Sequence, residues 1–173
     1  SPAATSAGVI AVRVYNCNDQ ICVLYSDGHE SNLTNDSSIW EVGASLSPTS
    51  QRIVFTSSRE GHSQVYVMNA DGSSRTNISG GFYHATNPSW SPTGEYVAFA
   101  AGSNDPSNIY RVNAVRISEI AVITGNQWAN VKYYDVVWLS DGTVQYKLWK
   151  DGCTGVFAVD PWVVTPPQEV TCP

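Results

Sequence analysis

Residues 88–99 read Pro-Ser-Trp-Ser-Pro-Thr-Gly-Glu-Tyr-Val-Ala-Phe, and residues 44–55 read Ala-Ser-Leu-Ser-Pro-Thr-Ser-Gln-Arg-Ile-Val-Phe. The two Ser-Pro pairs begin at Ser47 and Ser91, 44 residues apart, and a related Leu-Ser-Asp-Gly stretch begins 48 residues further on, at Leu139. A fixed period of this length is typical of propellers and solenoids. The repeat therefore indicates the unit of the fold before any strand is assigned.

The second half of each unit recurs as well. Residues 64–72 read Gln-Val-Tyr-Val-Met-Asn-Ala-Asp-Gly, and the same pattern returns at 21–28, at 108–114 and more faintly at 155–160. Each unit divides into short strand-like runs separated by Ser-Pro, Gly and Asp-Gly turns, whose residues favour tight turns. In the second unit the expected strands are 42–47, 52–57, 64–69 and 75–79. In the fourth unit they are 135–140, 143–149, 156–160 and a poorer outer strand near 169–172. Four antiparallel strands in each unit is the arrangement of a propeller blade.

We therefore expect an all-β protein, a four-bladed β-propeller of four-stranded antiparallel blades. The expected blades are approximately 8–37, 38–81, 82–126 and 127–173, and residues 1–7 are interpreted as a linker or a processed N-terminus. The first blade lacks an obvious inner strand, which would leave an unpaired sheet edge. Either residues 2–7 fold back to fill it, or an upstream segment or a neighbouring copy does, joining chains head to tail.

Composition narrows the class of protein. Hydrophobic residues make up 42% of the 173 residues, enough for a core, whereas charged residues make up only 14% against the roughly 25% of typical globular domains. The net charge is −6 and the nine Lys and Arg residues are scattered singly, so no basic stripe is available for nucleic acid. No apolar run reaches the roughly 18 residues of a membrane span.

The four cysteines favour disulfides over zinc, because the chain has no C-x-x-C motif and few histidines. Hairpin spacing predicts a Cys17–Cys22 bond, and the position of Cys153 in the last hairpin loop predicts a bond to Cys172. A sparsely charged chain with paired cysteines indicates an extracellular or periplasmic location; four free thiols in a cytosolic protein are the alternative. Sequons at Asn32, Asn35 and Asn77 are candidate glycosylation sites or chance occurrences.

Residues 89–99, Ser-Trp-Ser-Pro-Thr-Gly-Glu-Tyr-Val-Ala-Phe, and residues 65–72, Val-Tyr-Val-Met-Asn-Ala-Asp-Gly, resemble the WD-like repeat of TolB-type β-propellers. The resemblance extends over about residues 8–171. It is strong in the two middle units, fair in the fourth and weak in the first. The motif implies turns and blade packing and contains no catalytic residue. Such repeats occur in periplasmic and extracellular binding modules and beside prolyl peptidase domains, so the resemblance implies fold more than function.

The sequence does not indicate an enzyme, a metal site or a cofactor. It has no G-x-S-x-G elbow and no H-E-x-x-H motif, and its three histidines fall in separate turn regions. Glu41 and Asp135 lie near the starts of inner strands, where a carboxylate pair would be needed for glycoside chemistry. Spacing alone does not bring these two carboxylates together, and we expect no catalytic site.

Aromatic residues give the only candidate binding site in the sequence. The connections into inner strands carry aromatic and histidine side chains that would form a girdle at one mouth of the ring, namely Trp40, Tyr83, His84, Tyr133 and Tyr134. Such rings bind sugars or peptides, or pack between blades. We expect a non-catalytic interaction or structural assembly module with protein partners, including copies of itself. The alternatives are a glycan- or peptide-binding module and the accessory propeller of a hydrolase.

Overall fold

The computed structural model describes residues 8–13, 20–36, 38–103, 108–114, 116, 120–125, 131–164 and 170, and these residues form four antiparallel sheets. The first sheet contains β1 (Val9–Arg13), β2 (Cys22–Tyr25) and β3 (Glu30–Asn32). The second contains β4 (Glu41–Leu46), β5 (Arg52–Ser57), β6 (Gln64–Asn69) and β7 (Thr76–Asn77). The third contains β8 (His84–Trp90), β9 (Tyr96–Gly102), β10 (Asn108–Asn113) and β11 (Ile120–Val122). The fourth contains β12 (Val131–Trp138), β13 (Val144–Lys150) and β14 (Cys153–Val159).

Each sheet is a meander in which consecutive strands pair, as the repeat predicts. Side chains alternate between buried and exposed along β12, where Val131 and Tyr133 are buried and Lys132 between them is exposed. The turn between β8 and β9 places Gly94 at φ 71°, a conformation that glycine adopts without strain. Among the described residues there is no helix, and so none that could cross a membrane.

Three apolar clusters hold neighbouring sheets together. Between the first and second sheets, Ile21 and Val23 pack with Phe55. The other two clusters lie between the second and third sheets and between the third and fourth, and they contain the tryptophans Trp90 and Trp138. Hydrogen bonds add to this packing: the indole Nε1 of Trp90 donates to the carbonyl oxygen of Ser45 at 3.1 Å, and the backbone N–H of Trp138 donates to Ser89 Oγ at 2.9 Å. The Trp of the repeat thus ties its blade to the preceding one in both cases.

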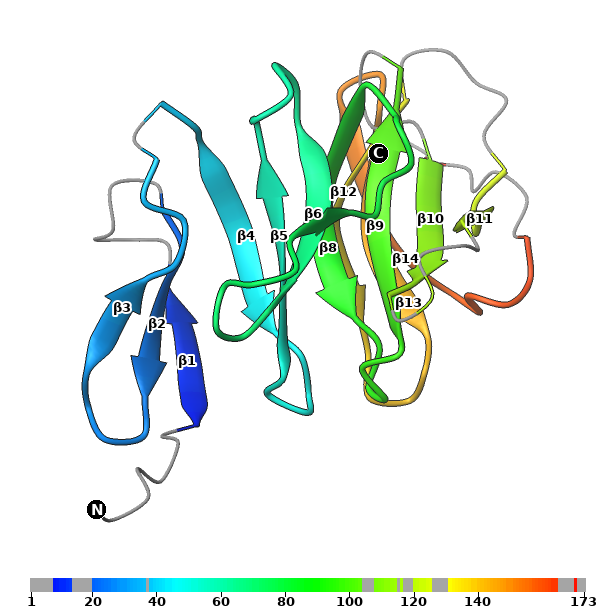
Figure 1. Cartoon of the computed structure of the whole chain (residues 1–173). Coiled ribbons are helices and arrows are strands. Elements are labelled where there is room, and N and C mark those ends of the chain that lie inside the picture. Colours follow the sequence, from blue (N-terminus) through cyan, green and yellow to red (C-terminus); the bar gives the residue numbers. More distant parts are fainter. Residues whose placement is uncertain are drawn as a thin grey trace, which may run out of the picture.

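The described sheets form an open succession. No core cluster of the described residues joins the fourth sheet to the first, and Figure 1 shows the first sheet at one end of the row, beside β4. The expected closure into a four-bladed ring is therefore not confirmed, although the antiparallel blades are. The first sheet has three described strands, and β1 is the strand that lies toward β4.

Two strands, the inner strand β12 and the outer strand β7, differ from the prediction in length. β12 begins at Val131, four residues before the expected start at Asp135, and β7 is shorter than the expected 75–79. The early start of β12 was missed because its regular alternation is interrupted by a shift in register between Tyr134 and Val137. Of the expected last strand, 169–172, only residue 170 is among the described residues, and the linker 1–7 lies outside them.

Candidate functional site

A β-bulge interrupts each of the three described inner strands at the same place. The register shifts between Val42 and Ser45 in β4, between Thr86 and Ser89 in β8, and between Tyr134 and Val137 in β12. A bulge adds one residue to a strand and redirects the side chains around it. These bulges therefore decide which side chains the inner strands turn away from the sheets.

One residue in each bulge has a positive φ: Gly43 at 62°, Asn87 at 54° and Asp135 at 51°. Gly, Asn and Asp are the residue types that adopt this left-handed conformation most readily. The intervals between them are 44 and 48 residues, the same as those between the Ser-Pro and Leu-Ser motifs. Sequence reasoning missed these positions, and their equal spacing with left-handed residue types is the signal that could have found them.

The three bulge residues line one concavity of about 460 Å³, which we call the bulge cavity. Its remaining lining comes mainly from the fourth sheet and includes Val137, Gln145, Lys147 and Val156. Lys147 Nζ lies 2.8 Å from Asp135 Oδ2, and both side chains are about half exposed, at 44% and 53%. The Asp135 carboxylate holds the pKa of Lys147 above its ordinary value, through the hydrogen bond first and charge second. Lys147 is therefore a cation at neutral pH.

A second concavity of about 410 Å³ adjoins the first, and we call it the aromatic cavity. It is lined by Asn87, which it shares with the bulge cavity, and by Lys132, Tyr133, Tyr134 and Trp149. The Tyr134 hydroxyl lies 3.1 Å from Thr154 Oγ1, which fixes the outer end of that side chain. The two cavities together make an elongated surface along the fourth sheet.

This surface lies on the face of the fourth sheet that is turned away from the third, which we call the free face. Val137 and Val156 on it are exposed, so within the described part of the chain no sheet packs against them. The corresponding faces of the second and third sheets are covered by their neighbours and bury Val54 and Ala98 next to the bulge. In the fourth sheet the position that corresponds to Val54 and Ala98 is occupied by Gln145, which pairs with Val137. A polar residue there suits contact with water or with a polar ligand.

The structure divides the predicted aromatic site. Trp40 and Tyr83 are exposed, at 45% and 54%, and precede β4 and β8. The Tyr83 ring stacks on His62 with centroids 4.7 Å apart and meets His84 edge-on at 4.9 Å. Tyr133, in contrast, is buried in the core with its ring 5.3 Å from that of Tyr146, so its ring packs between blades.

Of the predicted aromatic residues, only Tyr134 and the edge of the buried Tyr133 line a cavity described here. Trp149, which sequence reasoning did not select, lies beside them. It falls inside a strand and not in a connection, and the alternation of β13 places it on the same face as Gln145 and Lys147. That alternation is the signal by which it could have been found.

The two carboxylates considered for catalysis have different partners. Glu41 is buried and its Oε1 lies 2.6 Å from the Arg59 guanidinium, whereas Asp135 pairs with Lys147 on the free face. Among the described residues, no group of three or more His, Cys, Asp or Glu side chains is placed to hold a metal ion. Glu41 and Asp135 are thus each paired with a different cation, in different blades.

Cys22 and Cys153 are disulfide-bonded, and none of the described cysteines is free. Their predicted partners, Cys17 and Cys172, lie outside the described residues, so the pairing stays a prediction. Of the sequons, Asn32 and Asn35 are exposed at and after the end of β3. Asn77 is half-buried and its Nδ2 donates to Gln64 Oε1 at 3.3 Å and to Glu60 Oε1 at 3.4 Å, so a glycan, which replaces one amide hydrogen, would remove one of these two bonds.

A row of antiparallel blades, in which Ser-Pro or Ser-Asp turns join the first two strands of a blade, defines a β-propeller protein. The profile of the TolB β-propeller domain matches residues 3–131, and the chain belongs to this family. In this chain the bulges described above lie in the inner strands, and the cavities lie along the fourth blade. No curated protein matches the sequence.

Solved structures share the fold at low identity. TolB from Acinetobacter baumannii is 18% identical with a TM-score of 0.63, and the match covers 82% of this chain and 35% of that one. A nidogen/laminin complex is 17% identical with a TM-score of 0.62, covering 83% and 52%. A puromycin-hydrolysing peptidase of Mycobacterium tuberculosis is 14% identical with a TM-score of 0.63, covering 83% and 24%. The chain thus spans about a quarter to a half of these proteins.

Proposed function

We propose that this chain is a non-catalytic interaction module of the extracellular space or periplasm, which binds a polypeptide partner along the free face of the fourth sheet. The observation that carries the proposal is the pair of adjoining concavities that share Asn87. Together they present aromatic side chains, exposed valines and a few polar groups on one rigid sheet. Sites of this composition use the apolar groups for affinity and the polar groups for orientation.

The relatives support a protein partner and a location outside the cytoplasm. One similar structure is a complex of nidogen with laminin, and another is TolB of a bacterium. The disulfide-bonded state of Cys22 and Cys153 fits an oxidising compartment. Assembly with copies of itself, at the inner edge of the first sheet, would be a second way in which the same module engages protein.

The experiment uses the purified chain and a random peptide library displayed on phage. Enriched peptides are made with a fluorescent label and titrated against the wild type, against Val156→Asp and against Val164→Asp. The two valines are almost equally exposed, at 57% and 60%, but only Val156 lines the bulge cavity. We expect Val156→Asp to weaken binding about tenfold or more, because an unpaired carboxylate would be desolvated under the peptide.

The control variant Val164→Asp should bind as the wild type does. Equal binding by both variants would place the peptide elsewhere and overturn the proposal, as would a failure to enrich any peptide that binds the wild type. Thermal unfolding of both variants checks that an effect of Val156→Asp does not arise from misfolding. Since Val156 is already exposed, we expect its replacement to leave the melting temperature nearly unchanged.

Glycan binding at the mouth is a second candidate function, favoured by the exposed ring of Tyr83 and its stacking on His62. Aromatic rings held in this way are stacking platforms for sugars. A glycan array probed with the wild type, Tyr83→Ala and Trp40→Ala tests it. Binding that both variants lose supports this function, and an array without any bound glycan removes it.

A further inference from the structure

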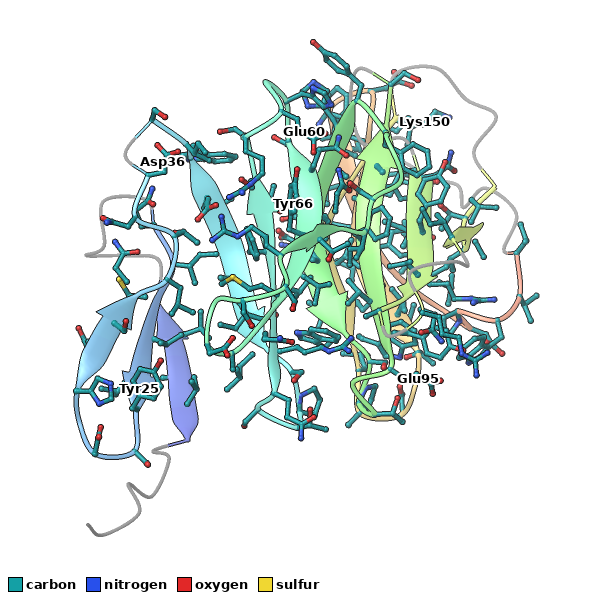
Figure 2. All side chains as sticks on the ribbon, viewed as in Figure 1. Tyr25, Asp36, Glu60, Tyr66, Glu95 and Lys150 are labelled. Carbon is teal, nitrogen blue, oxygen red and sulfur yellow. The ribbon has the colours of Figure 1, made fainter. Side chains whose placement is uncertain are left out.

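The lysines of this chain are gathered on one sheet. The sequence has three, Lys132, Lys147 and Lys150, and all lie on β12 and β13 of the fourth sheet. The whole chain carries a net charge of −6, so this concentration of ammonium groups opposes the overall charge. In Figure 2, Lys150 is labelled at the same edge of the molecule as Glu60 and opposite the edge of Glu95.

Two of the lysines alternate with aromatic rings on the free face. Lys132 pairs in register with Trp149, and Tyr134 pairs with Lys147. Directly opposed side chains of an antiparallel pair lie close enough to interact. The result is a two-by-two pattern in which each cation has an aromatic neighbour across the strands and another along its own strand. Lys132, Tyr134 and Trp149 line the aromatic cavity, and Lys147 lines the adjoining bulge cavity.

The carboxylate of Asp135 already contacts one of these cations. Asp135 Oδ2 lies 2.8 Å from Lys147 Nζ on a half-exposed surface, where an ion pair contributes little to stability. A ligand carboxylate can therefore compete with Asp135 for Lys147 at a small cost. The ion pair shows that the Lys147 ammonium group is placed to donate a hydrogen bond to a carboxylate at the rim of the bulge cavity.

From these observations we infer that the partner bound at the free face is an acidic polypeptide segment, and this inference rests on the proposed function. Its carboxylates engage Lys132 and Lys147, and its apolar side chains contact Trp149, Val137 and Val156. The exposed valines favour a polypeptide over a sugar, because a valine surface gives hydroxyl groups no hydrogen bond. The negative charge of the remaining molecule would repel such a segment elsewhere and so direct it to this face.

The test uses labelled synthetic peptides that differ only in carrying Glu, Gln or Lys at the same positions between apolar residues, titrated against the intact chain at low and high salt. We expect the Glu peptide to bind most tightly and the Lys peptide least, with the preference for Glu reduced by salt. Lys132→Gln and Lys147→Gln should each weaken binding of the Glu peptide about twofold to fivefold. Arg116→Gln, which removes the same charge from an exposed residue outside the fourth sheet, is the matched control and should have no such effect.

Asp135→Asn gives the sharpest test, because the expected change has the opposite sign. Asn keeps the shape of Asp and tolerates the positive φ of this position, but it no longer neutralises Lys147. The Glu peptide should therefore bind more tightly to Asp135→Asn than to the wild type, while the Gln peptide should be unaffected.

The outcomes separate the inference from the proposed function. If Glu and Gln peptides bind equally and Asp135→Asn changes neither, but Val156→Asp abolishes both, the free face binds polypeptide and its preference for acidic segments is refuted. If no peptide is sensitive to Val156→Asp, the proposed function itself fails. Tighter binding of the Lys peptide would also overturn the inference.

Discussion

The guanidinium of Arg59 lies 2.6 Å from the carboxylate of Glu41, a side chain that is almost completely buried at the start of β4. Arg59 also donates to Ser57 Oγ at 3.1 Å and lies over the ring of Tyr66, 5.0 Å from its centroid. At the corresponding register position the third sheet has Ala85, which is buried and apolar. A charged pair thus replaces apolar packing in the second blade.

Removing Arg59 should therefore be costly. Arg59→Ala would leave the Glu41 carboxylate buried without its counter-ion, and we expect a loss of about 3–5 kcal/mol in the free energy of unfolding. Denaturant titration measures it. The double variant Glu41→Ala with Arg59→Ala should recover part of the loss, because Ala is the residue at this position in the third blade. Arg116→Ala is the control. If Arg59→Ala were no less stable than this control, the prediction would be contradicted.

The turn between β8 and β9 should not accept a β-branched residue. Gly94 has φ 71°, as expected from the repeat, and an added Cβ would lie 3.4 Å from Pro48 Cδ. Gly94→Val should lower the free energy of unfolding by about 1–3 kcal/mol through backbone strain. Ser103→Ala, at an exposed loop position, should be nearly silent. Equal losses in the two variants would mean that the turn is not a constraint on the fold.

Alkaline pH should destabilise the protein through Tyr66. Burial first, and then the hydrogen bond of its hydroxyl to Glu60, raises the pKa of Tyr66 from its ordinary 10.0 to about 12. A raised pKa means that the folded protein holds this proton when the unfolded chain has lost it. The contribution is thus complete below pH 10 and is lost as the pH rises toward 12. Tyr66→Phe should show a smaller decline in unfolding free energy across that interval than the wild type, and an identical decline would refute the assignment.

Acid should weaken the same contact between Tyr66 and Glu60, because it protonates the Glu60 carboxylate. The Tyr66 hydroxyl first, and the Asn77 amide second, hold the pKa of Glu60 below its ordinary value. A depressed pKa stabilises the folded state above the pKa of the unfolded chain, and that stabilisation disappears as the pH falls through the folded value. In Glu60→Gln the free energy of unfolding should therefore decline less, as the pH is lowered, than in the wild type. The side chain is largely exposed to solvent, so we expect a small effect, and an unchanged decline would assign the acid sensitivity to other carboxylates.

Non-reducing peptide mapping should recover Cys17 with Cys22 and Cys153 with Cys172. Cys22 and Cys153 are both disulfide-bonded, which fixes one partner of each predicted bond. The bond at Cys153 closes the longer loop, and a longer loop confers more stability in the chain-entropy model. Replacing Cys153 and Cys172 by Ser should therefore destabilise the protein more than replacing Cys17 and Cys22. Alkylation of all four cysteines without reduction would refute both pairings.

The repeat predicted the blades because its residues act locally. Ser91, Thr93 and Gly94 form the turn through contacts with one another and with the next strand, and alternation along each strand then selects the buried face. The bulges were not predicted, since a bulge depends on how two paired strands share their hydrogen bonds. The burial of Tyr133 depends on the same feature: the bulge after it leaves Tyr133 in the core while Asp135 lines the cavity.

An all-β chain of TolB-type blades can be predicted from the sequence alone, because a period of about 44 residues, turn chemistry and alternation are properties of neighbouring residues. Which side chains meet in the candidate site depends on the tertiary structure. It joined Gly43, Asn87 and Asp135 from three blades around one cavity, and it set Lys132 and Lys147 beside Trp149 and Tyr134 on a face that none of the described sheets covers. Such neighbours come from different strands and different blades, and their proximity depends on sheet register and blade packing, which no local pattern encodes.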